Sequence, residues 1–528
     1  MEQKAAIRCQ YPQILYKSSR EKSIEPSPIR FAGKSIAFLY LCSKLFCSFI
    51  MSAYSVCRLT APDRVQGEIA LPASKSISNR ALVLYALAGK QSLRTDFADC
   101  EDSLLMLNAL QSPEAVKDAG AAGTVMRFLT AYYAQTPGEW TLTGTERMKQ
   151  RPIGLLVDAL RQLGADITYT ENPGYPPLLI KGKRLSGGRL SIDGSISSQY
   201  ITALMLIGPY VDGGLEIELL NKIASAPYIR MTLGLMQVFG AQLSFEGNLI
   251  RIEAGAYTAP EEFRVEADWS AASYWFEVLS LAQSGQVLLH GLQADSLQGD
   301  AKVMEWFRDF GVQAEFIELP AGKKTSAPAE VVPELIAGKV VTESIAGKAL
   351  PKSIAGEALP ESVSSKIAGS PQAGKPSKRA LLLSKTKQQC SFFEADFSQQ
   401  PDLAQTFVVT AALRGIPFRI DGLESLKIKE TDRLQALIRE MLKLGFILEE
   451  SSPNTLEWQG KKQPAQHRVS IATYQDHRMA MSFAPVALRM KDQNEIKHFE
   501  IEDPAVVAKS YPGFWEDLKS CGFTIEYK

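Results

Sequence analysis

Apolar and polar residues recur along this chain in a repeated pattern of a helix followed by a strand. Five amphipathic helical runs end at a glycine and lead at once into residues that alternate between apolar and polar types, as in a strand with one buried face. Glycine at that place accepts the left-handed conformation that closes a helix. The five runs are LRQLGA (160–165), MQVFGA (236–241), FRDFGV (307–312), MLKLGF (441–446) and LKSCGF (518–523). The pattern predicts several similar α/β units, with helices packed inside sheets or over them.

The first part of the chain does not share this pattern. It is basic and serine-bearing, and then apolar from 38 to 51 with Lys44 in the middle. A membrane span needs roughly 20 uninterrupted apolar residues, so this run is too short to predict one. We interpret residues 1–52 as an N-terminal extension that is disordered or absent from the mature protein, with Met51 as the functional start.

A second segment, 319–379, is rich in Ala, Gly, Ser, Pro and Lys and repeats a unit of nine residues. The copies read IAGKVVTES, IAGKALPKS and IAGEALPES. Pro351 and Pro360 would interrupt a helix or a strand ladder, and the copies have too few bulky apolar groups for a solenoid core. The segment is therefore predicted to be a mobile surface insertion.

Composition narrows the classes of function. The 528 residues suggest roughly two to four domains, and the 58 basic and 58 acidic residues leave no net charge to attract nucleic acid. The seven cysteines form no CxxC pair, which favours a reducing cytoplasm over a disulfide scaffold. The four histidines lack HxxxH or HxH spacing, so we predict no metal site.

Cations at the predicted start of a helix point to an anion site. In LPASKSISNRALVLYALA (71–88), Lys75 precedes an apolar helical run and Arg80 is predicted in its first turn. A cation there opposes the helix dipole unless an anion binds beside it, and serine hydroxyls and free amides would complete a phosphate cradle. An ordinary capped helix with a solvated lysine and arginine is the alternative.

The same arrangement recurs near the C-terminus. Lys429 and Arg433 stand four apart on one face of a helix that is predicted to begin near Thr431. Asp476 is predicted to cap a further helix that carries Arg478 in its first turn. In a chain without net charge, several such cations predict one shared site for a polyanion.

Two further segments carry the same signal in the first half of the chain. Gly123 precedes Arg127 in GAAGTVMRFLT, where glycine lets the backbone approach a ligand closely. Arg151 stands directly before Pro152, which is predicted as a first helical residue.

Nine motifs, in order along the chain, resemble the 5-enolpyruvylshikimate-3-phosphate (EPSP) synthase family. The resemblance implies a two-domain inside-out α/β barrel, each domain with three βαβαββ units around buried parallel helices. It also implies a first domain at 73–266, and a second at 53–72 and 267–528 that contains the insertion. The motifs are SKSISNRAL (74–82), AGTVMR (122–127), RMKQRPIG (147–154), DGSISSQY (193–200), SAPYIRMT (225–232), SLQGD (296–300), PDLAQT (401–406), KETDR (429–433) and DHRMAM (476–481).

The resemblance also implies two substrates and the residues that bind them. Shikimate 3-phosphate would be bound by Lys75, Ser76, Arg80, Ser197, Ser198, Gln199, Ser225, Tyr228, Asp402, Ser425 and Lys429. Phosphoenolpyruvate would be bound by Lys75, Gly123, Arg151, Gln199, Arg433, Arg478 and Lys509. Four positions depart from the family pattern, namely Ala73, Ala121, Phe128 and Ser425.

The implied reaction transfers the enolpyruvyl group to the 5-hydroxyl of shikimate 3-phosphate and releases phosphate. Asp402 is the candidate base for the hydroxyl, and Glu430 and Lys75 are the candidate proton donors to the methylene carbon. The arginines would stabilise charge in the transition state. The resemblance implies no cofactor and a monomer. The charge, apolar-run length, histidine spacing and cysteine pattern described above predict no nucleic acid, no membrane and no metal, and a cytoplasmic protein.

The sequence argues against three other functions. The related enolpyruvyl transferase that acts on UDP-N-acetylglucosamine uses a Cys acid in the loop equivalent to 147–151, where this chain has none. A non-catalytic anion-binding homologue would bind both anions without phosphate release, and the presence of Asp402, Glu430 and Lys75 argues against it. A pathway kinase would need GxxxxGK[ST], and no such run occurs.

Overall fold

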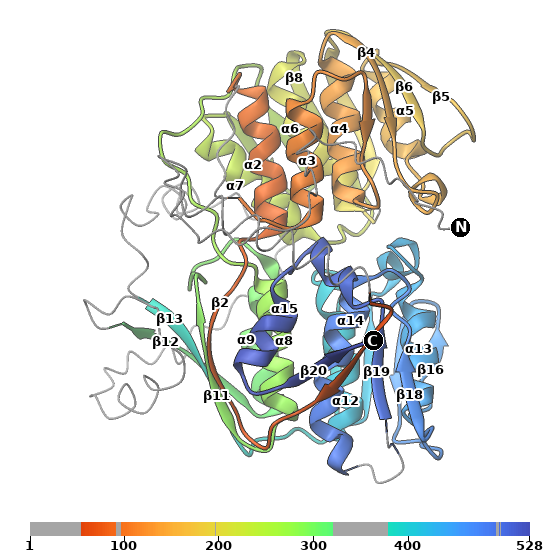
Figure 1. The fold of residues 1–528 in the computed structure, drawn as a ribbon. Helices are drawn as coiled ribbons and strands as arrows, with labels where there is room; N and C mark the ends of the chain where they lie inside the picture. Colours follow the sequence, from red (N-terminus) through yellow and green to blue (C-terminus); the bar gives the residue numbers. More distant parts are fainter. Residues whose placement is uncertain (1–53, 91–96, 196, 320–378, 493–495, 497) are drawn as a thin grey trace, which may run out of the picture. The chain divides into compact units, whose positions relative to one another are not determined.

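The computed structural model describes residues 54–528 apart from 91–96, 196, 320–378, 493–495 and 497 (Figure 1). All of these residues belong to one compact unit, Lys44–Lys528. The interpretations of 1–52 and of nearly all of 319–379 lie outside the described residues. None of the helices in the described ranges has the length and apolarity needed to cross a membrane.

The described strands form five four-stranded sheets, and every sheet has the same order. Two strands pair in parallel at one edge, and the remaining neighbours are antiparallel. This confirms a mixed α/β fold made of similar units. Two sheets lie early in the chain: β3 (Val116–Asp118), β4 (Gly138–Thr143), β6 (Leu178–Gly182) and β5 (Asp166–Tyr169); and β7 (Ser186–Asp193), β8 (Asp212–Leu220), β10 (Leu249–Ile252) and β9 (Leu243–Glu246).

The other three sheets are made mostly from the second half of the chain. Two strands that precede the first helix also join them, since β2 pairs in parallel with β11, and β1 lies between β19 and β20. Their strands, in order, are β2 (Val65–Ala70), β11 (Gly285–His290), β13 (Arg379–Lys385) and β12 (Val312–Glu318); β14 (Phe393–Asp396), β15 (Phe418–Asp421), β17 (Thr455–Trp458) and β16 (Glu449–Ser452); and β18 (Arg468–Ile471), β19 (His498–Glu502), β1 (Val56–Thr60) and β20 (Thr524–Tyr527).

Buried apolar side chains form two separate cores. One contains residues from Ile77 to Tyr257, and the other joins Cys57–Ile69 side chains to residues from Ala267 onward. Figure 1 shows α2, α4 and α6 beside one another in the first half, and α8, α12 and α14 in the second. The helices are α2 (Lys75–Leu87), α3 (Glu101–Gln111), α4 (Gly123–Gln135), α5 (Gly154–Gln162), α6 (Ser198–Ile207), α7 (Ala226–Val238), α8 (Trp269–Leu281), α9 (Val303–Trp306), α12 (Ala404–Arg414), α13 (Arg433–Lys443), α14 (His477–Phe483) and α15 (Phe514–Ser520).

The five glycines that were predicted to close helices adopt the left-handed conformation. Each is followed by a strand within a few residues, so the helix-then-strand prediction is confirmed. Their φ angles are +89° at Gly164, +85° at Gly240, +75° at Gly311, +88° at Gly445 and +97° at Gly522.

The predicted starts of three helices were wrong. Helix α2 begins at Lys75, so Arg80 lies in its second turn rather than its first. The reason is a contact from far along the chain, because the backbone N–H of Lys75 donates to the Asp268 carboxylate at 3.1 Å. Helix α5 begins at Gly154, which leaves Pro152 outside it.

The third wrong start is that of α13, near the C-terminal motif KETDR. Asp432 caps this helix by accepting from the backbone N–H of Gln435 at 3.1 Å, so the helix begins at Arg433. Lys429 therefore lies in the connection before the helix and not on its face. Asp476 caps α14 as predicted, and Arg478 stands in the first turn.

One carboxyl group is buried in the second core. Glu277 of α8 is fully buried, and neither carboxyl oxygen has a hydrogen-bond partner among the described residues. Burial raises the pKa of Glu277 well above its usual range, and the nearby Thr410 hydroxyl offsets only part of this rise. Burial thus favours the protonated form of this carboxyl in the folded protein.

We expect Glu277→Gln to stabilise the protein at pH 8 and to change little at pH 5. A raised pKa means that the folded state loses stability as pH rises above the unfolded value near 4.3, because only the unfolded chain then ionises. Urea unfolding at both pH values should show that the free energy of unfolding of the variant exceeds that of the wild type by about 1–3 kcal/mol at pH 8 only. Glu440→Gln is the control, because Glu440 is buried but ion-paired with Lys443 at 2.7 Å, and this change should destabilise at pH 8.

Candidate active site

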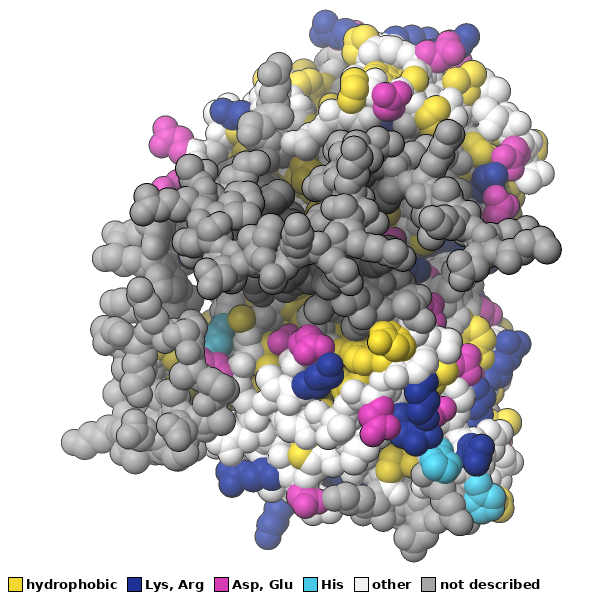
Figure 2. Space-filling view, viewed as in Figure 1, with side chains coloured by type: hydrophobic (Ala, Val, Ile, Leu, Met, Phe, Trp, Pro, Cys, Tyr) yellow, Lys and Arg dark blue, Asp and Glu magenta, His cyan; other side chains and the backbone are white. Residues whose placement is uncertain are grey.

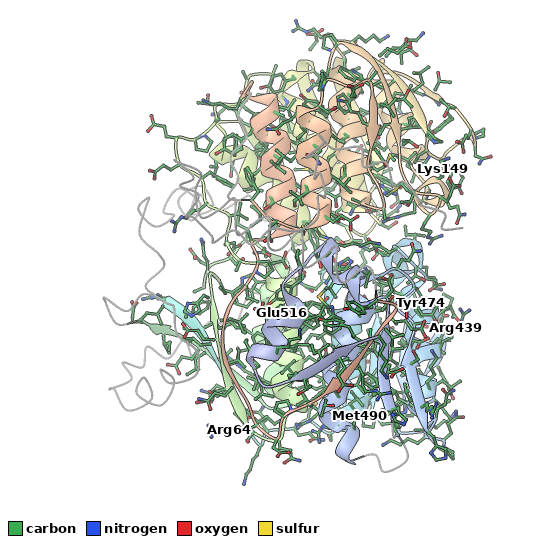
Figure 3. All side chains as sticks on the ribbon, in the orientation of Figure 1. Arg64, Lys149, Arg439, Tyr474, Met490 and Glu516 are labelled. Atoms are coloured by element: carbon green, nitrogen blue, oxygen red, sulfur yellow. The ribbon has the colours of Figure 1, made fainter. Side chains whose placement is uncertain are left out.

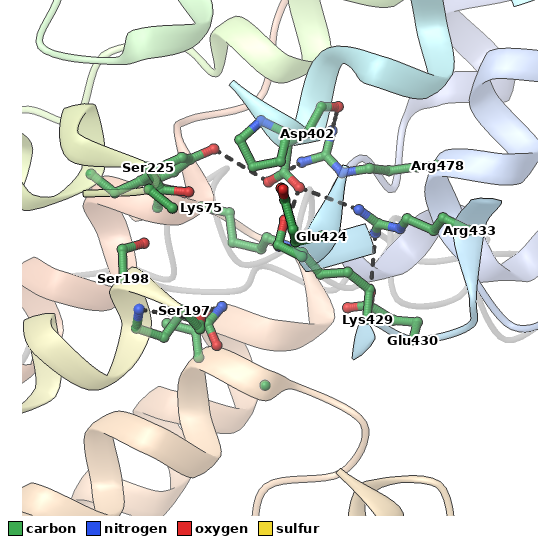
Figure 4. Close-up of a pocket in the computed structure, with 18 of the residues that line it drawn as sticks. Lys75, Ser197, Ser198, Ser225, Asp402, Glu424, Lys429, Glu430, Arg433 and Arg478 are labelled. Carbon is green, nitrogen blue, oxygen red and sulfur yellow. Dashed lines mark hydrogen bonds and ion pairs between the residues drawn. The ribbon is translucent and has the colours of Figure 1, made fainter. Parts of the chain in front are cut away.

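One pocket brings together the candidate residues from both halves of the chain (Figure 4). Every predicted site residue lines it except Lys509. Five cations from four separate segments meet there as the sequence predicted, and Arg80 adds a sixth. The predicted residues in its lining are Lys75, Ser76, Arg80, Gly123, Arg151, Ser197, Ser198, Gln199, Ser225, Tyr228, Asp402, Ser425, Lys429, Glu430, Arg433 and Arg478.

Lys509 lies outside this lining. Its ammonium donates to the backbone carbonyl of Gln475 at 2.7 Å, at the end of the short helix Pro504–Lys509. The structure therefore does not bring Lys509 to the other candidate residues, although it holds the lysine close to the segment that leads into α14.

Helix starts supply much of the pocket wall. Lys75, Gly123 and Arg433 are the first residues of α2, α4 and α13, and Ser197 and Ser225 stand at the N-caps of α6 and α7. Free backbone N–H groups and the positive end of each helix dipole gather there. The predicted cations therefore lie beside helix starts in the folded chain, and this arrangement favours an anionic ligand.

Asp402 occupies the centre of the cations (Figure 4). Its carboxylate is 2.9 Å from Arg478, 3.2 Å from Arg433 and 3.5 Å from Lys429, and it accepts a hydrogen bond from the Tyr228 hydroxyl at 3.3 Å. Burial alone raises the pKa of Asp402, but the three cations outweigh burial and hold the pKa well below its usual range. The cations around Asp402 thus favour its ionised form, and its role as base stays a prediction.

Arg433 joins three carboxylates with one guanidinium. Its Nε donates to Asp476 at 2.7 Å, Nη1 to Asp402 at 3.2 Å and Nη2 to Glu430 at 3.0 Å. Burial lowers the pKa of Arg433, and the three carboxylates outweigh it and raise the pKa above its usual range. The fixed fork of arginine thus sets the relative positions of Asp402 and Glu430.

The cations around Glu430, one of the two candidate proton donors, favour its ionised form. Burial raises its pKa, but Arg433 and Arg151 outweigh burial and hold the pKa of Glu430 well below its usual range. Its carboxylate lies 3.9 Å from Arg151. Glu430 can act as an acid only after it takes up a proton.

Lys75, the other candidate donor, is paired with a carboxylate that the sequence did not reveal. Its ammonium lies 3.1 Å from Asp102, at the start of α3. Burial lowers the pKa of Lys75, and Asp102 outweighs burial and raises it. Nothing in the residues around Asp102 could have indicated this contact, because it joins two segments that only the fold brings together.

Arg80 contacts two aromatic rings of the pocket lining. Its guanidinium carbon is 5.5 Å from the centre of the Phe128 ring and 5.9 Å from that of Tyr228, and its Nε donates to Thr232 at 2.8 Å. Burial lowers the pKa of Arg80 to about 10. Phe128, which departs from the family pattern, thus holds a candidate binding residue through a cation–π contact.

Gly123 allows two arginines to approach the start of α4. A Cβ atom there would lie 2.6 Å from Nη2 of Arg151 and 3.0 Å from Nη1 of Arg127. Nε of Arg151 has no hydrogen-bond partner among the described residues, although the side chain is buried. An unpaired donor beside a pocket is suited to an anionic ligand.

The other cations of the motif RMKQR have different roles. Arg147 donates to the backbone carbonyls of Glu430 at 3.0 Å and Lys429 at 3.2 Å, and so ties the first half of the chain to the candidate catalytic segment. Lys149, which is labelled in Figure 3, does not belong to the pocket lining and pairs with Glu171 at 3.0 Å.

Two further residues of the site, Asp476 and His477, were not predicted from the sequence as site residues. Asp476, predicted only as a helix cap, also binds Arg433. His477 lines the pocket, is buried, and has no hydrogen-bond partner at either ring nitrogen among the described residues. Burial, together with the nearby cations Lys75 and Arg478, lowers the pKa of His477 well below its usual range, so the imidazole is neutral.

The pocket carries a local excess of positive charge in a chain that has none. Six cations line it against four carboxylates: Asp102, Asp402, Glu424 and Glu430. On the outer face, basic and acidic side chains are mixed where described atoms are visible (Figure 2). The cations of the pocket thus give this place a local attraction for anions.

Comparisons with known proteins agree with this geometry. The family model of EPSP synthase (3-phosphoshikimate 1-carboxyvinyltransferase) matches residues 59–112, 109–326 and 374–518. A 3-phosphoshikimate 1-carboxyvinyltransferase from Bacteroides fragilis is 42% identical over 469 residues, covering 89% of this chain and 98% of the relative. One from Photobacterium damsela subsp. piscicida is 34% identical, covering 86% and 96%. The solved structure of EPSP synthase from Acinetobacter baumannii has a TM-score of 0.60 at 19% identity, and covers 90% of this chain and all of that one.

Proposed function

Because the chain belongs to the EPSP synthase family, we propose that its pocket carries out the reaction of that family. The protein transfers the enolpyruvyl group of phosphoenolpyruvate to the 5-hydroxyl of shikimate 3-phosphate, in aromatic amino-acid biosynthesis. The observation that carries the proposal is the meeting of six cations around Asp402 and Glu430 in one buried pocket. The two substrates together bring two phosphates and two carboxylates, which need such a set of cations.

The two substrates use different parts of the pocket. Shikimate 3-phosphate lies against the first half, where Arg80, the α6 start at Ser197–Gln199, and Ser225 offer cationic and hydroxyl donors. Phosphoenolpyruvate lies between Arg151, Arg433 and Arg478. The free Nε of Arg151 and the Gly123 backbone support this second position.

The reaction proceeds through a tetrahedral intermediate. The 5-oxygen loses its proton and bonds to C2 of phosphoenolpyruvate, while C3 gains a proton and becomes a methyl group. That methyl group then loses a proton, the C2–O bond to phosphate breaks, and phosphate leaves with the bonding electrons. The chain must therefore supply a base for the hydroxyl and an acid for C3.

Asp402 is the proposed base. The carboxylate and phosphate of phosphoenolpyruvate compete for Arg433 and Arg478, which now hold Asp402 at 3.2 and 2.9 Å. Weaker pairing raises the pKa of Asp402 toward the range in which it can accept a proton. Glu430 and Lys75 remain the proposed acids, and Glu430 has the same route to a raised pKa through its contacts with Arg433 and Arg151.

The finer architecture and cellular setting belong to the same proposal. The common strand order of the five sheets and the two cores support a two-domain inside-out α/β barrel, divided at 73–266 and at 53–72 with 267–528. The free cysteines Cys57, Cys100, Cys390 and Cys521 support a reducing cytoplasm. We propose a monomer, which light scattering of the purified chain tests.

Phosphate release from the purified protein tests the function. Turnover should require both shikimate 3-phosphate and phosphoenolpyruvate, and mass spectrometry should find one enolpyruvyl product per phosphate. UDP-N-acetylglucosamine in place of shikimate 3-phosphate should give no product. Binding of both substrates without phosphate release would instead identify a non-catalytic homologue.

We expect Gly123→Ala to weaken phosphoenolpyruvate binding selectively. The added methyl group would lie 2.6 Å from Nη2 of Arg151, so the guanidinium must move. The KM for phosphoenolpyruvate should rise by about 10-fold or more, as expected for a disturbed charged hydrogen bond. The KM for shikimate 3-phosphate should change little, and an equal rise for both substrates would contradict the placement of Arg151. Gly255→Ala is the control for a glycine change as such, because Gly255 lies outside the pocket lining, has no left-handed φ and has no atom within 4 Å of an added Cβ.

A further inference from the structure

The chain passes between its two hydrophobic cores twice, and the two passages pair with each other. The backbone N–H of Ser74 donates to the backbone carbonyl of Glu266 at 2.8 Å, and the backbone N–H of Asp268 donates to the backbone carbonyl of Pro72 at 2.9 Å. Ala73 and Ala267 form an antiparallel bridge between them. Helix α2 follows the first passage, as Figure 1 shows, and α8 follows the second. Two helices of different cores thus begin side by side.

Asp268 caps both of these helices with one carboxylate. Its Oδ1 accepts from the backbone N–H of Ala271 at 3.0 Å, in the first turn of α8. Its Oδ2 accepts from the backbone N–H of Lys75 at 3.1 Å, the first residue of α2. The serine that precedes α2, Ser74, makes no side-chain cap to that helix. The start of α2 thus depends on a residue from the second passage.

Gln298 makes a second connection at the same place. Its Oε1 accepts from the Ser74 hydroxyl at 3.0 Å and from the backbone N–H of Trp269 at 3.1 Å, and its Nε2 donates to the carbonyl of Ala267 at 2.8 Å. Gln298 is buried, and all three of these bonds use its amide group. A side chain bound this way fixes one passage against the other.

Both helix starts carry pocket residues immediately beyond these contacts. Lys75 is the first residue of α2 and lines the pocket. In the first turns of α8, Ser270 and Tyr274 accept from Arg478 at 3.4 and 3.3 Å. A shift between the two helix starts would therefore move Lys75 relative to Arg478.

We propose that Asp268 and Gln298 are positioning residues, which hold the starts of α2 and α8 together and so set Lys75 opposite Arg478. The inference rests on the proposed function, since its readout is the transfer reaction. Neither residue lines the pocket. A displacement of about 1 Å in such a group can lower the rate by about 100-fold.

Asp268→Ser separates positioning from folding. A serine hydroxyl can still cap α8 but is too short to accept from Lys75 as well. We expect kcat to fall by about 10–100-fold at a temperature well below the melting transition, with the KM values changed much less. Asp268→Asn keeps one acceptor oxygen in the native shape and should retain more activity than the serine variant. Gln298→Leu should likewise lower kcat.

Glu262→Gln is the control for a change of carboxylate just ahead of the same passage. Glu262 is exposed and lies outside the pocket lining, so kcat should remain near that of the wild type. If Asp268→Ser and Gln298→Leu lower only the melting temperature and leave kcat unchanged, the two residues are structural and the inference is overturned. Wild-type turnover is measured alongside, because its absence would instead contradict the proposed function.

Discussion

The variant Asp402→Asn is expected to bind both substrates and to lose at least about 100-fold in turnover, the usual scale for an acid–base group. Asparagine has nearly the same shape, so the pocket wall is preserved. Its side-chain carbonyl oxygen can accept a hydrogen bond from Arg478 or Arg433, which lie 2.9 and 3.2 Å from the Asp402 carboxylate in the wild-type chain. It cannot accept the proton of the 5-hydroxyl, however, and the chemical step is slowed.

Binding should be kept or tightened in this variant. Loss of the Asp402 charge frees part of the positive field of Arg478, Arg433 and Lys429, which then acts on the substrate anions. Equilibrium titration with each substrate, followed by rapid-quench measurement of a single turnover, separates the two effects. A variant with weak binding and a normal single-turnover rate would remove Asp402 from the role of base.

Asp421→Asn is the control for this substitution. Asp421 of β15 is also an aspartate paired with an arginine, at 3.1 Å from Arg419, but it lies outside the pocket lining. Its loss should leave turnover near the wild-type value. Comparison of turnover in the two variants therefore separates the effect of losing a carboxylate inside the pocket from the effect of losing an ion pair elsewhere.

Local signals predicted the repeated units because the information for them lies within a few residues. Each closing glycine, such as Gly164 or Gly445, stands next to the apolar pattern of its own helix, and its positive φ follows from that local need. The positions of helix starts were less predictable. Lys75 is capped by Asp268, which stands 193 positions further along the chain, and no propensity of the surrounding residues encodes such a contact.

The candidate cations were predictable because they stand in motifs at helix starts. The carboxylates that neutralise them were not, apart from Asp402 and Glu430. Asp102 lies 27 positions from Lys75, and Asp476 lies 43 positions from Arg433. Buried charges need partners, which predicts that such carboxylates exist but does not identify them. Lys509 shows the converse, since a matching motif did not bring its side chain to the pocket lining.

The variant Arg433→Met is expected to lose about 3–5 kcal/mol of unfolding free energy at pH 8, along with activity. The Arg433 side chain is 2% exposed and donates to Asp476, Asp402 and Glu430. Methionine fills a similar volume but leaves the carboxylates without their common partner in a buried place. Urea unfolding gives the free energy, and phosphate release gives the activity.

Arg419→Met is a matched control for this change. Arg419 also contacts three carboxylates, those of Asp421, Glu457 and Glu394, but its side chain is 39% exposed. Water solvates these carboxylates when the arginine is lost, so the cost should be below about 1 kcal/mol. Equal losses in the two variants would show that burial at Arg433 does not govern the stability of the cluster.

The pH dependence of the Arg433→Met loss gives a second check. In the wild type, Arg433 helps to hold the pKa values of Asp402 and Glu430 well below their usual range, and this contribution is present above about pH 4 and lost as pH falls. In the variant both pKa values rise, so the carboxyls take up protons in mild acid and no longer oppose burial. The difference in unfolding free energy between variant and wild type should therefore shrink from pH 8 to pH 5. A difference that stays constant over this range would mean that the destabilisation comes from packing rather than from stranded charge.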